Sequence, residues 1–402
     1  MTEEVWIFDG IRTAFGKKGG ALASVRVDNL AAAPLRALVE RNQLPDDAIE
    51  DVLLGNTNQA GEDSRNLARN AALIAGLSPS VCGVTVNRLC GSGLEALLMG
   101  SRTIRSGEAD LLLVGGAESM SRAPLILSRA ETAFAGNQQL ADSVMGWRFP
   151  HLALLQQYGS ESMAETAENV AIELDITREA CDTFALRSQQ QCEAARQRGF
   201  FDEETLPITV PSKRRGGQSI PVATDEHPRA DVSAESLALL KPLHAGGVTT
   251  AANASGINDG AAALLIGSEF AATRHALRPR ARVLAGAVAG VLPRVMGLGP
   301  VGAIRKVLQR TGLTLDDMDV IEINEAFAAQ VLGCMKQLQL QENDSRINPN
   351  GGAIALGHPL GASGARLALT AMHQLEATGG RYALISLCIG IGQGIATIIE
   401  RV

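Results

Sequence analysis

The 402-residue chain is poor in aromatic side chains, which make up 3% of it, and it has no long apolar run. A helix needs about 20 consecutive apolar residues to cross a bilayer, so a membrane protein is not expected. The formal net charge is -7 without a concentrated basic run, which leaves no obvious surface for nucleic acid. The first residues lack the build of a signal peptide, and we therefore expect a cytoplasmic protein.

Paired spacing is also missing among the six cysteines, which stand at positions 82, 90, 181, 192, 334 and 388. A reduced chain is therefore expected, in which any special cysteine is a reactive one. Basic residues gather only at Lys213, Arg214 and Arg215. This stretch is either a solvated loop or a contact for a phosphate group of an anionic cofactor.

The chain does contain 46% hydrophobic residues and 42 glycines, which is typical of an α/β protein with tight turns. Short apolar runs predict buried strands at residues 5–8, 52–54, 84–86, 111–114, 320–323, 383–387 and 395–399. Helical patterns lie between these runs. Strands that are apolar throughout imply a sheet covered by helices on both faces, hence α/β architecture.

The two ends of the chain resemble each other at a constant offset of 268 residues. Residues 51–56 match residues 319–324, and Cys90 with its glycines matches His358 with its glycines. A duplicated α/β unit is the better interpretation of this match.

The middle of the chain differs in character, with polar helices predicted at 164–173 and 178–197. It reads as an insertion at a strand end, where loops commonly carry function. We therefore divide the chain into an N-terminal half (1–120 plus 249–270), an inserted domain (121–248) and a C-terminal half (271–402).

Cys90 lies in Asn87-Arg-Leu-Cys-Gly-Ser-Gly93, after a predicted strand and before a helix predicted at residues 94–104. The sulfur is therefore expected at a helix N-terminus, where N–H groups and the helix dipole favour a thiolate at neutral pH. The alternative is a buried inert cysteine, which this segment alone supports equally well.

His358 lies in a glycine-dense turn before a helix predicted at residues 365–374. Imidazole can take the proton of a nucleophilic cysteine. A lone histidine in a loop is usually structural, but this one stands at the position equivalent to Cys90. A pseudo-twofold axis would bring the two helix starts face to face.

Cys388 opens the segment Cys388-Ile-Gly-Ile-Gly-Gln-Gly394 at the end of a strand. A second thiol could transfer a proton at carbon, and N–H groups around Gly390 could hold an oxyanion. A dinucleotide-binding loop would need a following βαβ unit, yet only eight residues remain, so a nicotinamide-dependent dehydrogenase is set aside. Asn324, at another strand end, either assists an oxyanion or satisfies a turn.

Together these segments resemble the motifs of the thiolase family, in the family's order and along nearly the whole chain. The matching segments are 87–93, 115–121, 253–260, 324–328, 351–366 and 388–394. The resemblance implies the five-layered αβαβα thiolase fold of two similar halves, with an inserted loop domain that binds coenzyme A. It also implies a homotetramer built as a dimer of dimers.

The resemblance further implies the roles of the catalytic residues. Cys90 is the nucleophile that becomes acylated, His358 activates it, and Cys388 is the acid or base. Asn324 holds a water that forms one oxyanion hole with His358, and the N–H groups of Cys90 and Gly390 form another. A 3-oxoacyl-CoA is then cleaved reversibly, with CoA as co-substrate and without a metal or redox cofactor.

By the same resemblance, the residues that bind coenzyme A are Met163, Arg229, Ser236, Ala251, Ala254, Ser255, Ala326 and Phe327. Arg229 would lie by the adenine, and Ser255 would bond the pantetheine arm. Ser162 and His244 depart from the pattern of the short-chain biosynthetic enzymes, so the subtype stays open at this point.

Within the family, residues 19–26, 59–63, 146–149 and 225–227 most resemble 3-oxoadipyl-CoA thiolases, which act in the catabolism of aromatic acids. Their substrate ends in a free carboxylate. Arg148 is the candidate partner for it, because a planar guanidinium suits a carboxylate and Trp147 and Phe149 could hold it. The alternative is that Arg148 packs in a dimer or covers its own loop. An acetoacetyl-CoA or general 3-ketoacyl-CoA thiolase is the alternative function.

Two further classes serve as alternatives. Another condensing enzyme of the same fold would lack the second cysteine, Cys388. A non-catalytic subunit that acts as a binding module would have lost Cys90, His358 or Cys388. All three residues are present, so an acyltransferase is predicted.

Overall fold

The computed structural model describes residues 3–212 and 218–402. Lys213, Arg214 and Arg215, the basic stretch singled out above, lie outside these ranges. Within them, each helix is too short or too polar to cross a membrane.

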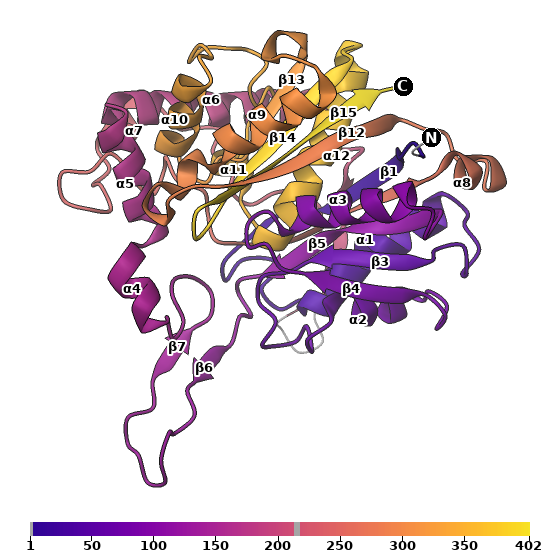
Figure 1. The fold of residues 1–402 in the computed structure, drawn as a ribbon, viewed down its shortest axis with the longest axis horizontal. Coiled ribbons are helices and arrows are strands. Elements are labelled where there is room, and N and C mark those ends of the chain that lie inside the picture. The colour runs from indigo at the N-terminus through magenta and orange to yellow at the C-terminus, as the bar shows by residue number, and fades with distance from the viewer. Residues whose placement is uncertain (1–2, 213–217) are drawn as a thin grey trace.

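One long mixed sheet runs through the molecule, with helices on both faces (Figure 1). In spatial order its main path is β13 (Val320–Ile323), β14 (Tyr382–Ile389), β15 (Gln393–Arg401), β12 (Ala281–Gly290), β1 (Trp6–Thr13), β11 (Asn258–Gly267), β5 (Leu111–Ser119), β3 (Asp51–Gly55) and β4 (Cys82–Val86). The short strands β2 (Gly16–Lys17) and β8 (Thr205–Leu206) pair with β11 and β1. Because β1 and β12 pair at only two positions, the sheet divides there into an N-terminal and a C-terminal part.

Buried side chains define five layers in the order helix, sheet, helix, sheet, helix. The outer layers are α1 (Val27–Arg41) and α2 (Leu67–Ala75) on the N-terminal part, and α9 (Gly299–Thr311) and α10 (Ala328–Gln337) on the C-terminal part. The middle layer consists of α3 (Ser92–Arg105) and α12 (Leu360–Thr378), which pack against both parts. This arrangement confirms the predicted αβαβα fold.

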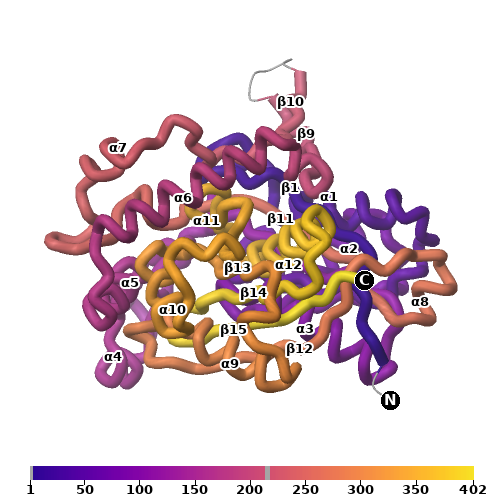
Figure 2. Tube along the Cα trace, turned by 90° about the horizontal axis from the view of Figure 1, so that it is seen from above, coloured from indigo at the N-terminus to yellow at the C-terminus, as the bar shows by residue number. Residues whose placement is uncertain are grey.

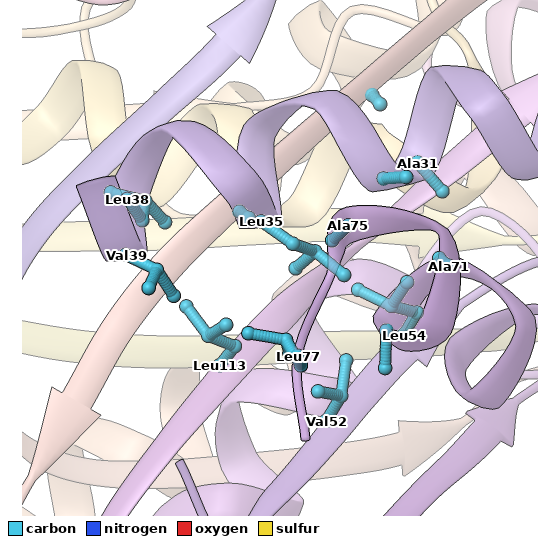
Figure 3. Close-up of a cluster of buried hydrophobic side chains, with 14 of the residues drawn as sticks. Ala31, Leu35, Leu38, Val39, Val52, Leu54, Ala71, Ala75, Leu77 and Leu113 are labelled. Atoms are coloured by element: carbon cyan, nitrogen blue, oxygen red, sulfur yellow. The ribbon is translucent and has the colours of Figure 1, made fainter. Parts of the chain in front are cut away.

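Strand β5 shows why the sheet sequences are apolar throughout. Leu113 lies in the outer cluster beside Leu35 and Val39 of α1 (Figure 3), whereas Leu112 and Val114 face the middle layer. Successive side chains of a strand point to opposite faces, so a strand between two helical layers buries both sets. Each buried side chain of this kind contributes roughly 1.5–3 kcal/mol.

The predicted duplication is visible in the order of the elements. β3, α3 and β5 of the N-terminal half correspond to β13, α12 and β14 of the C-terminal half. The counterpart of β4 is reduced to one bridge between Ile321 and Ile347, beside β13.

Residues 121–248 leave the N-terminal half after β5 and return before β11. Their first part is a hairpin of β6 (Leu125–Leu127) and β7 (Leu140–Asp142), which projects from the body of the molecule (Figure 1). The two predicted polar helices are present, and they lie beside α10 on the C-terminal side (Figure 2). The segment contains α4 (Leu152–Tyr158), α5 (Met163–Glu173), α6 (Arg178–Gln197), β9 (Ile208–Val210), β10 (Ile220–Val222) and α7 (Ala234–Ala238).

Every strand predicted from an apolar run is present, but β11 and β12 were not predicted. Both are rich in alanine and glycine, which carry little strand propensity of their own. A Cβ atom on Gly286 of β12 would lie 2.3 Å from Leu98 of α3. The small residues serve close packing against the middle layer, which a local pattern does not reveal. The remaining short elements are α8 (Glu269–Arg274), α11 (Ala353–Leu356), η1 (Pro293–Leu298) and η2 (Leu315–Asp317).

Candidate active site

The starts of α3 and α12 meet in the middle layer, as the pseudo-twofold relation predicted. A Cβ atom on Gly93 of α3 would lie 2.5 Å from the carbonyl oxygen of Gly361 in α12. One on Gly364 would lie 2.2 Å from the backbone nitrogen of Leu94. Only glycine permits such contacts, so the two helices touch backbone to backbone at the ends that follow Cys90 and His358.

Cys90 is half-buried in the turn between β4 and α3. The Ser92 hydroxyl fixes this turn, because it accepts from the N–H of Arg88 at 2.9 Å and donates to the carbonyl of Leu89 at 2.6 Å. Leu89 has a φ of 46°, in the left-handed region that leucine rarely adopts. Strained backbone of this kind clusters at functional sites. Gly91 presses the turn against the other half, since a Cβ atom there would lie 2.6 Å from Ile389.

Burial raises the pKa of the Cys90 thiol to about 11. The N–H groups of Gly390 and of Cys90 itself favour the thiolate and lower this pKa, whereas the Glu118 carboxylate raises it. The predicted thiolate at neutral pH is therefore wrong for the protein without substrate, because desolvation outweighs the helix dipole. Cys90 rests as a thiol, with the N–H of Gly390 directed at its sulfur.

His358 is buried at the start of α12, and its hydrogen bonds define its tautomer. Its Nδ1 lies 2.6 Å from the hydroxyl of Ser363, whose own hydrogen is donated to the carbonyl of Pro359 at 2.9 Å. Nδ1 must therefore carry the ring proton, which leaves the lone pair on Nε2. Nε2 then accepts from the side-chain amide of Asn324 at 3.3 Å. The backbone N–H of His358 donates to Asn258 at 2.9 Å.

Burial lowers the pKa of His358 to about 3, and the charge of Arg366 contributes to the same shift. The imidazole is therefore neutral at neutral pH, with Nε2 available as a base. Since the pKa of Cys90 is about 11, the resting site holds a neutral thiol and a neutral imidazole rather than an ion pair.

Cys388, at the end of β14, lies in a small buried cluster with Met296 and Ala326. Burial raises the pKa of its thiol well above the usual range, and the neighbouring Cys90 raises it further. Cys388 is thus a protonated thiol at neutral pH, a form that can donate a proton. Cys90 is thus close enough to Cys388 to influence its ionisation.

Five of the residues predicted to bind coenzyme A lie around that cluster. Met163 and Phe327 pack against it, and Ala326 is part of it. The N–H of Ser255 donates to the carbonyl of Ala326 at 2.9 Å. Ala254 forms a β-bridge with Phe327. The structure thus brings these five residues together beside Cys388.

The other three predicted coenzyme A residues lie on the surface. Ala251 is in an exposed turn. Ser236 is exposed on α7, and its hydroxyl donates to the carbonyl of Ser233 at 2.8 Å. Arg229 is exposed, and its backbone N–H donates to Gln189 of α6 at 2.8 Å. Their roles stay predictions.

Arg148 lies half-buried between β7 and α4. In residues 3–212 and 218–402 its guanidinium makes no hydrogen bond, ion pair or ring contact, so Trp147 and Phe149 do not hold it by stacking. The indole N–H of Trp147 is itself buried without a partner in these residues. Arg148 therefore has an uncommitted charge, but no contact links it to Cys90 or His358.

The sequence reasoning did not single out Ser363, Arg366 or Glu118. Ser363 and Arg366 follow His358 by five and eight residues and lie inside the matching segment 351–366. The signal that could have identified them is their polarity in a helix made otherwise of small and apolar residues. Arg366 and Glu322 are both fully buried, with 3.8 Å between their charged groups. None of their side-chain nitrogen or oxygen atoms has a hydrogen-bond partner among the described residues, which is costly for buried polar groups.

Known families and proteins match this chain along its whole length. The description "Thiolase, N-terminal domain" matches residues 5–270, and "Thiolase, C-terminal domain" matches residues 277–401. A 3-oxoadipyl-CoA/3-oxo-5,6-dehydrosuberyl-CoA thiolase of Escherichia coli (strain K12) is 56% identical over 99% of this chain and 100% of its own. A beta-ketoadipyl-CoA thiolase of Acinetobacter baylyi is 54% identical over 100% of both chains.

Solved structures also match the whole chain. Human mitochondrial 3-ketoacyl-CoA thiolase in complex with CoA has a TM-score of 0.91 and 39% identity, covering 100% of this chain and 98% of its own. The acetyl-CoA acetyltransferase of Bacillus anthracis has a TM-score of 0.92 and 38% identity, covering 100% and 99%.

Proposed function

The chain belongs to the thiolase family and is an acyltransferase, and on that premise we propose that it cleaves 3-oxoadipyl-CoA. The reaction uses CoA and yields acetyl-CoA and a shortened acyl-CoA, and its reverse is a Claisen condensation. The observation that carries this substrate is the 56% identity, along the full length, to a relative named for it. A place in the catabolism of aromatic acids follows from that substrate.

In the first half-reaction, Nε2 of His358 takes the proton of Cys90, and the sulfur attacks the 3-keto carbon of the substrate. The N–H groups of Gly390 and Cys90 receive the resulting oxyanion, since both already favour negative charge at this sulfur. The buried side-chain oxygen of Asn324 has no partner among the described residues, which suits a water that assists at the thioester oxygen of the leaving group.

The bond between C2 and C3 then breaks, and its electron pair stays on C2. Cys388 donates its proton to that carbon, so that acetyl-CoA leaves and the remaining acyl group stays on Cys90. In the second half-reaction Cys388 takes the proton of an incoming CoA thiol, whose sulfur attacks the acyl group. Cys90 leaves as a thiolate and recovers its proton from His358.

Coenzyme A lies along the residues gathered beside Cys388. Ser255 and Phe327 are held there by backbone pairing between their segments, which gives the pantetheine arm a fixed wall. Arg229 and Ser236, on the surface near α6, meet the outer part of the cofactor. CoA is a co-substrate in this proposal.

Arg148 binds the free carboxylate of the substrate. What supports this role is its uncommitted guanidinium in the segment between β7 and α4, together with the fit of a guanidinium to a carboxylate. The alternative function, a thiolase for acetoacetyl-CoA or neutral 3-ketoacyl-CoA substrates, needs no such residue.

The test is thiolysis of 3-oxoadipyl-CoA, acetoacetyl-CoA and 3-oxohexanoyl-CoA by the purified protein. A preference for the dicarboxylic substrate supports the proposal, whereas equal rates favour the alternative function. Arg148→Ala should raise KM for 3-oxoadipyl-CoA about tenfold or more, because one charge-assisted contact is lost, and should leave acetoacetyl-CoA unaffected. Arg129→Ala, in the exposed hairpin, is the matched control. Equal losses on both substrates would remove Arg148 from the proposal.

The protein also assembles as a homotetramer, a dimer of dimers. β4 is the last strand of the described sheet and has no fully buried residue, and its unpaired edge is one that a second copy can extend. The projecting hairpin exposes Leu125, Leu127 and Leu140 by more than 60% each, which favours burial against another copy. Light scattering after gel filtration tests the assembly, and a monomeric mass contradicts it.

We place the enzyme in the cytoplasm. All six cysteines are free thiols, which suits a reducing compartment. Fractionation of cells that produce the tagged protein tests this placement.

A further inference from the structure

Glu118 is a buried carboxylate with four hydrogen-bond donors around it. It is 2% exposed near the end of β5. One oxygen accepts from the backbone N–H groups of Thr57 and Gly361, both at 3.0 Å. The other accepts from the N–H of Asn58 at 3.2 Å and the side-chain amide of Asn56 at 3.3 Å. No cation pairs with Glu118 in the part of the chain that the structure describes.

Gly361 gives this arrangement its importance. It is the second residue of α12 and follows His358 by three positions. The first N–H groups of a helix lack partners within the helix, and the N-cap residue of α12, Pro359, provides no side-chain cap. Glu118 fills that role from the other half of the molecule. It thereby ties the start of the His358 helix to β5 and to the residues that follow β3.

A small cavity lies beside the same carboxylate. Its volume is about 10 Å³, and Asn56, Asn58 and Glu118 are among the residues that line it. The side-chain oxygens of Asn56 and Asn58 are both buried without a partner among the described residues. A cavity of roughly 10–15 Å³ with two or more polar partners is sufficient for one water molecule.

We propose that Glu118 is a positioning residue that holds the start of α12 against the N-terminal half and restrains ionisation of Cys90, with one ordered water in the cavity beside it. The water donates to the amide oxygens of Asn56 and Asn58, and it accepts from the Glu118 carboxyl when that group is protonated. The inference rests on the proposed thiolase function and names what restrains the nucleophile before substrate binds.

The charge of Glu118 acts against the Cys90 thiolate, because the carboxylate binds Gly361, whose carbonyl oxygen lies against Gly93, three residues after Cys90. Burial raises the pKa of Glu118 to about 7, although its N–H donors oppose the shift. The carboxyl is therefore partly ionised near neutral pH, and its charge raises the pKa of Cys90. The other groups that influence Cys90 are its own N–H and the N–H of Gly390, and both are uncharged.

The charged residues across the cavity are Glu62, Asp63 and Arg122. Glu62 is paired with Arg122 through its carboxylate, and the N–H groups of Gly61 and Arg65 donate to Asp63. These groups have partners of their own, so Glu118 is the charge that remains uncompensated.

The test compares alkylation of Cys90 by iodoacetamide with thiolysis in wild-type protein and Glu118→Gln. Alkylation is followed from pH 7 to pH 12 by peptide mass spectrometry, a range that includes the pKa of Cys90 of about 11, with the exposed Cys82 as reference in the same sample. We expect the alkylation midpoint of Cys90 to fall by about half a pH unit, so that alkylation at pH 9 is about threefold faster. The kcat of thiolysis falls about tenfold, because the amide keeps only one acceptor oxygen and its nitrogen must face N–H donors at the other position, which loosens the start of α12.

These opposite changes distinguish the proposal from a purely structural role, which would slow both reactions together. An unmoved midpoint, or a midpoint at higher pH, would overturn it. Glu118→Asp keeps the charge but shortens the reach, so kcat should fall while the midpoint stays with the wild type. A shift as large as that of Glu118→Gln would contradict the assigned role of the charge.

Glu62→Gln, at the rim of the same cavity, should leave the midpoint and kcat unchanged. A crystal structure should show one water between Asn56 and Asn58, and an empty cavity would reject that part of the proposal. Alkylation requires no acyl-CoA, so a wild-type protein without thiolysis would refute the proposed function and leave this test intact.

Discussion

Each half of the molecule places the start of a middle-layer helix at the site, but the residues at the two helix starts have different chemistry. In each half a turn leads into a helix of the middle layer, and the two helix starts touch. The strand β4 precedes this turn in the N-terminal half, and the short helix α11 precedes it in the C-terminal half. The N-terminal half places Cys90 at this turn, and the C-terminal half places His358 there. A duplicated scaffold thus supplies two equivalent positions that face each other. A nucleophile and a base need only one substitution each to occupy them.

The halves also differ in the charge that surrounds each residue. Cys90, which must become negative, lies under the influence of Glu118. His358, which must become positive, lies under that of Arg366. Both neighbours oppose the charge that catalysis requires, and burial acts in the same direction. Both residues therefore stay neutral at rest, and charge separation must await a substrate whose oxyanion the site can stabilise.

The largest expected effect is on kcat of thiolysis, and it distinguishes the covalent role of Cys90 from the proton-transfer role of His358. Cys90→Ser should lower kcat of thiolysis by at least about 10⁴-fold, because the acyl-enzyme no longer forms. His358→Ala should cost about 10²–10⁴-fold, since water can replace a base in part. Stopped-flow release of acetyl-CoA and trapping of labelled acyl-enzyme measure the two effects. Labelled acyl-enzyme in Cys90→Ser would assign the nucleophile to another residue.

The next effect concerns stability in acid. The pKa of His358 is about 3 when folded, against about 6.5 for an unperturbed histidine, so below pH 6.5 only the unfolded chain binds this proton. Stability is therefore lost as the pH falls from 6.5 toward 3. His358→Asn lacks this proton and should lose roughly 3 kcal/mol less than the wild type between pH 7.5 and pH 4.5. Urea unfolding at both pH values measures the difference, and identical losses would contradict the neutral buried imidazole.

The paired helix starts could be predicted from the sequence because they depend on local signals. Glycines, a predicted helix after each turn and the constant offset of 268 residues place Cys90 and His358 without any structure. The cluster around Cys388 was predicted from the family resemblance alone, through Ser255 and Phe327.

The ionisation states could not be predicted in this way. The pKa of Cys90 depends on burial and on Glu118, which lies 28 residues away in sequence and reaches the site across a strand end. Arg366 and Glu322 meet only when α12 packs on β13. Desolvation is a property of the assembled layers. The local pattern therefore predicted a lowered pKa for Cys90, whereas burial in the structure raises it.

A smaller effect tests the contact between the halves. Gly364→Ala would place a Cβ atom 2.2 Å from the backbone nitrogen of Leu94 in the facing helix. Backbone cannot move aside as a side chain can, so we expect a loss of about 1–3 kcal/mol in the free energy of unfolding, together with lower kcat. Thermal and urea unfolding measure the first, and thiolysis the second.

Gly136→Ala is the matched control, because nothing lies within 4 Å of the added Cβ in the projecting hairpin. It should leave both quantities unchanged. Equal effects of the two substitutions would mean that the close approach of α3 and α12 does not matter to the site.

The smallest expected effect tests whether the charge of Arg366 acts on His358 as that of Glu118 acts on Cys90. Arg366→Met removes the positive charge that opposes an imidazolium at His358, so the acid limb of kcat/KM should move to higher pH. The move should be smaller than about one pH unit, or ~1.4 kcal/mol, because burial is the larger cause and persists in the variant. Glu322→Gln is the control: burial raises the pKa of Glu322 to about 8, so this carboxyl is already neutral where the acid limb lies. The limb should stay in place in that variant. If both variants moved the acid limb equally, the effect would come from disruption of the buried pair and not from the charge of Arg366. The two helix starts would then differ only in the groups they carry.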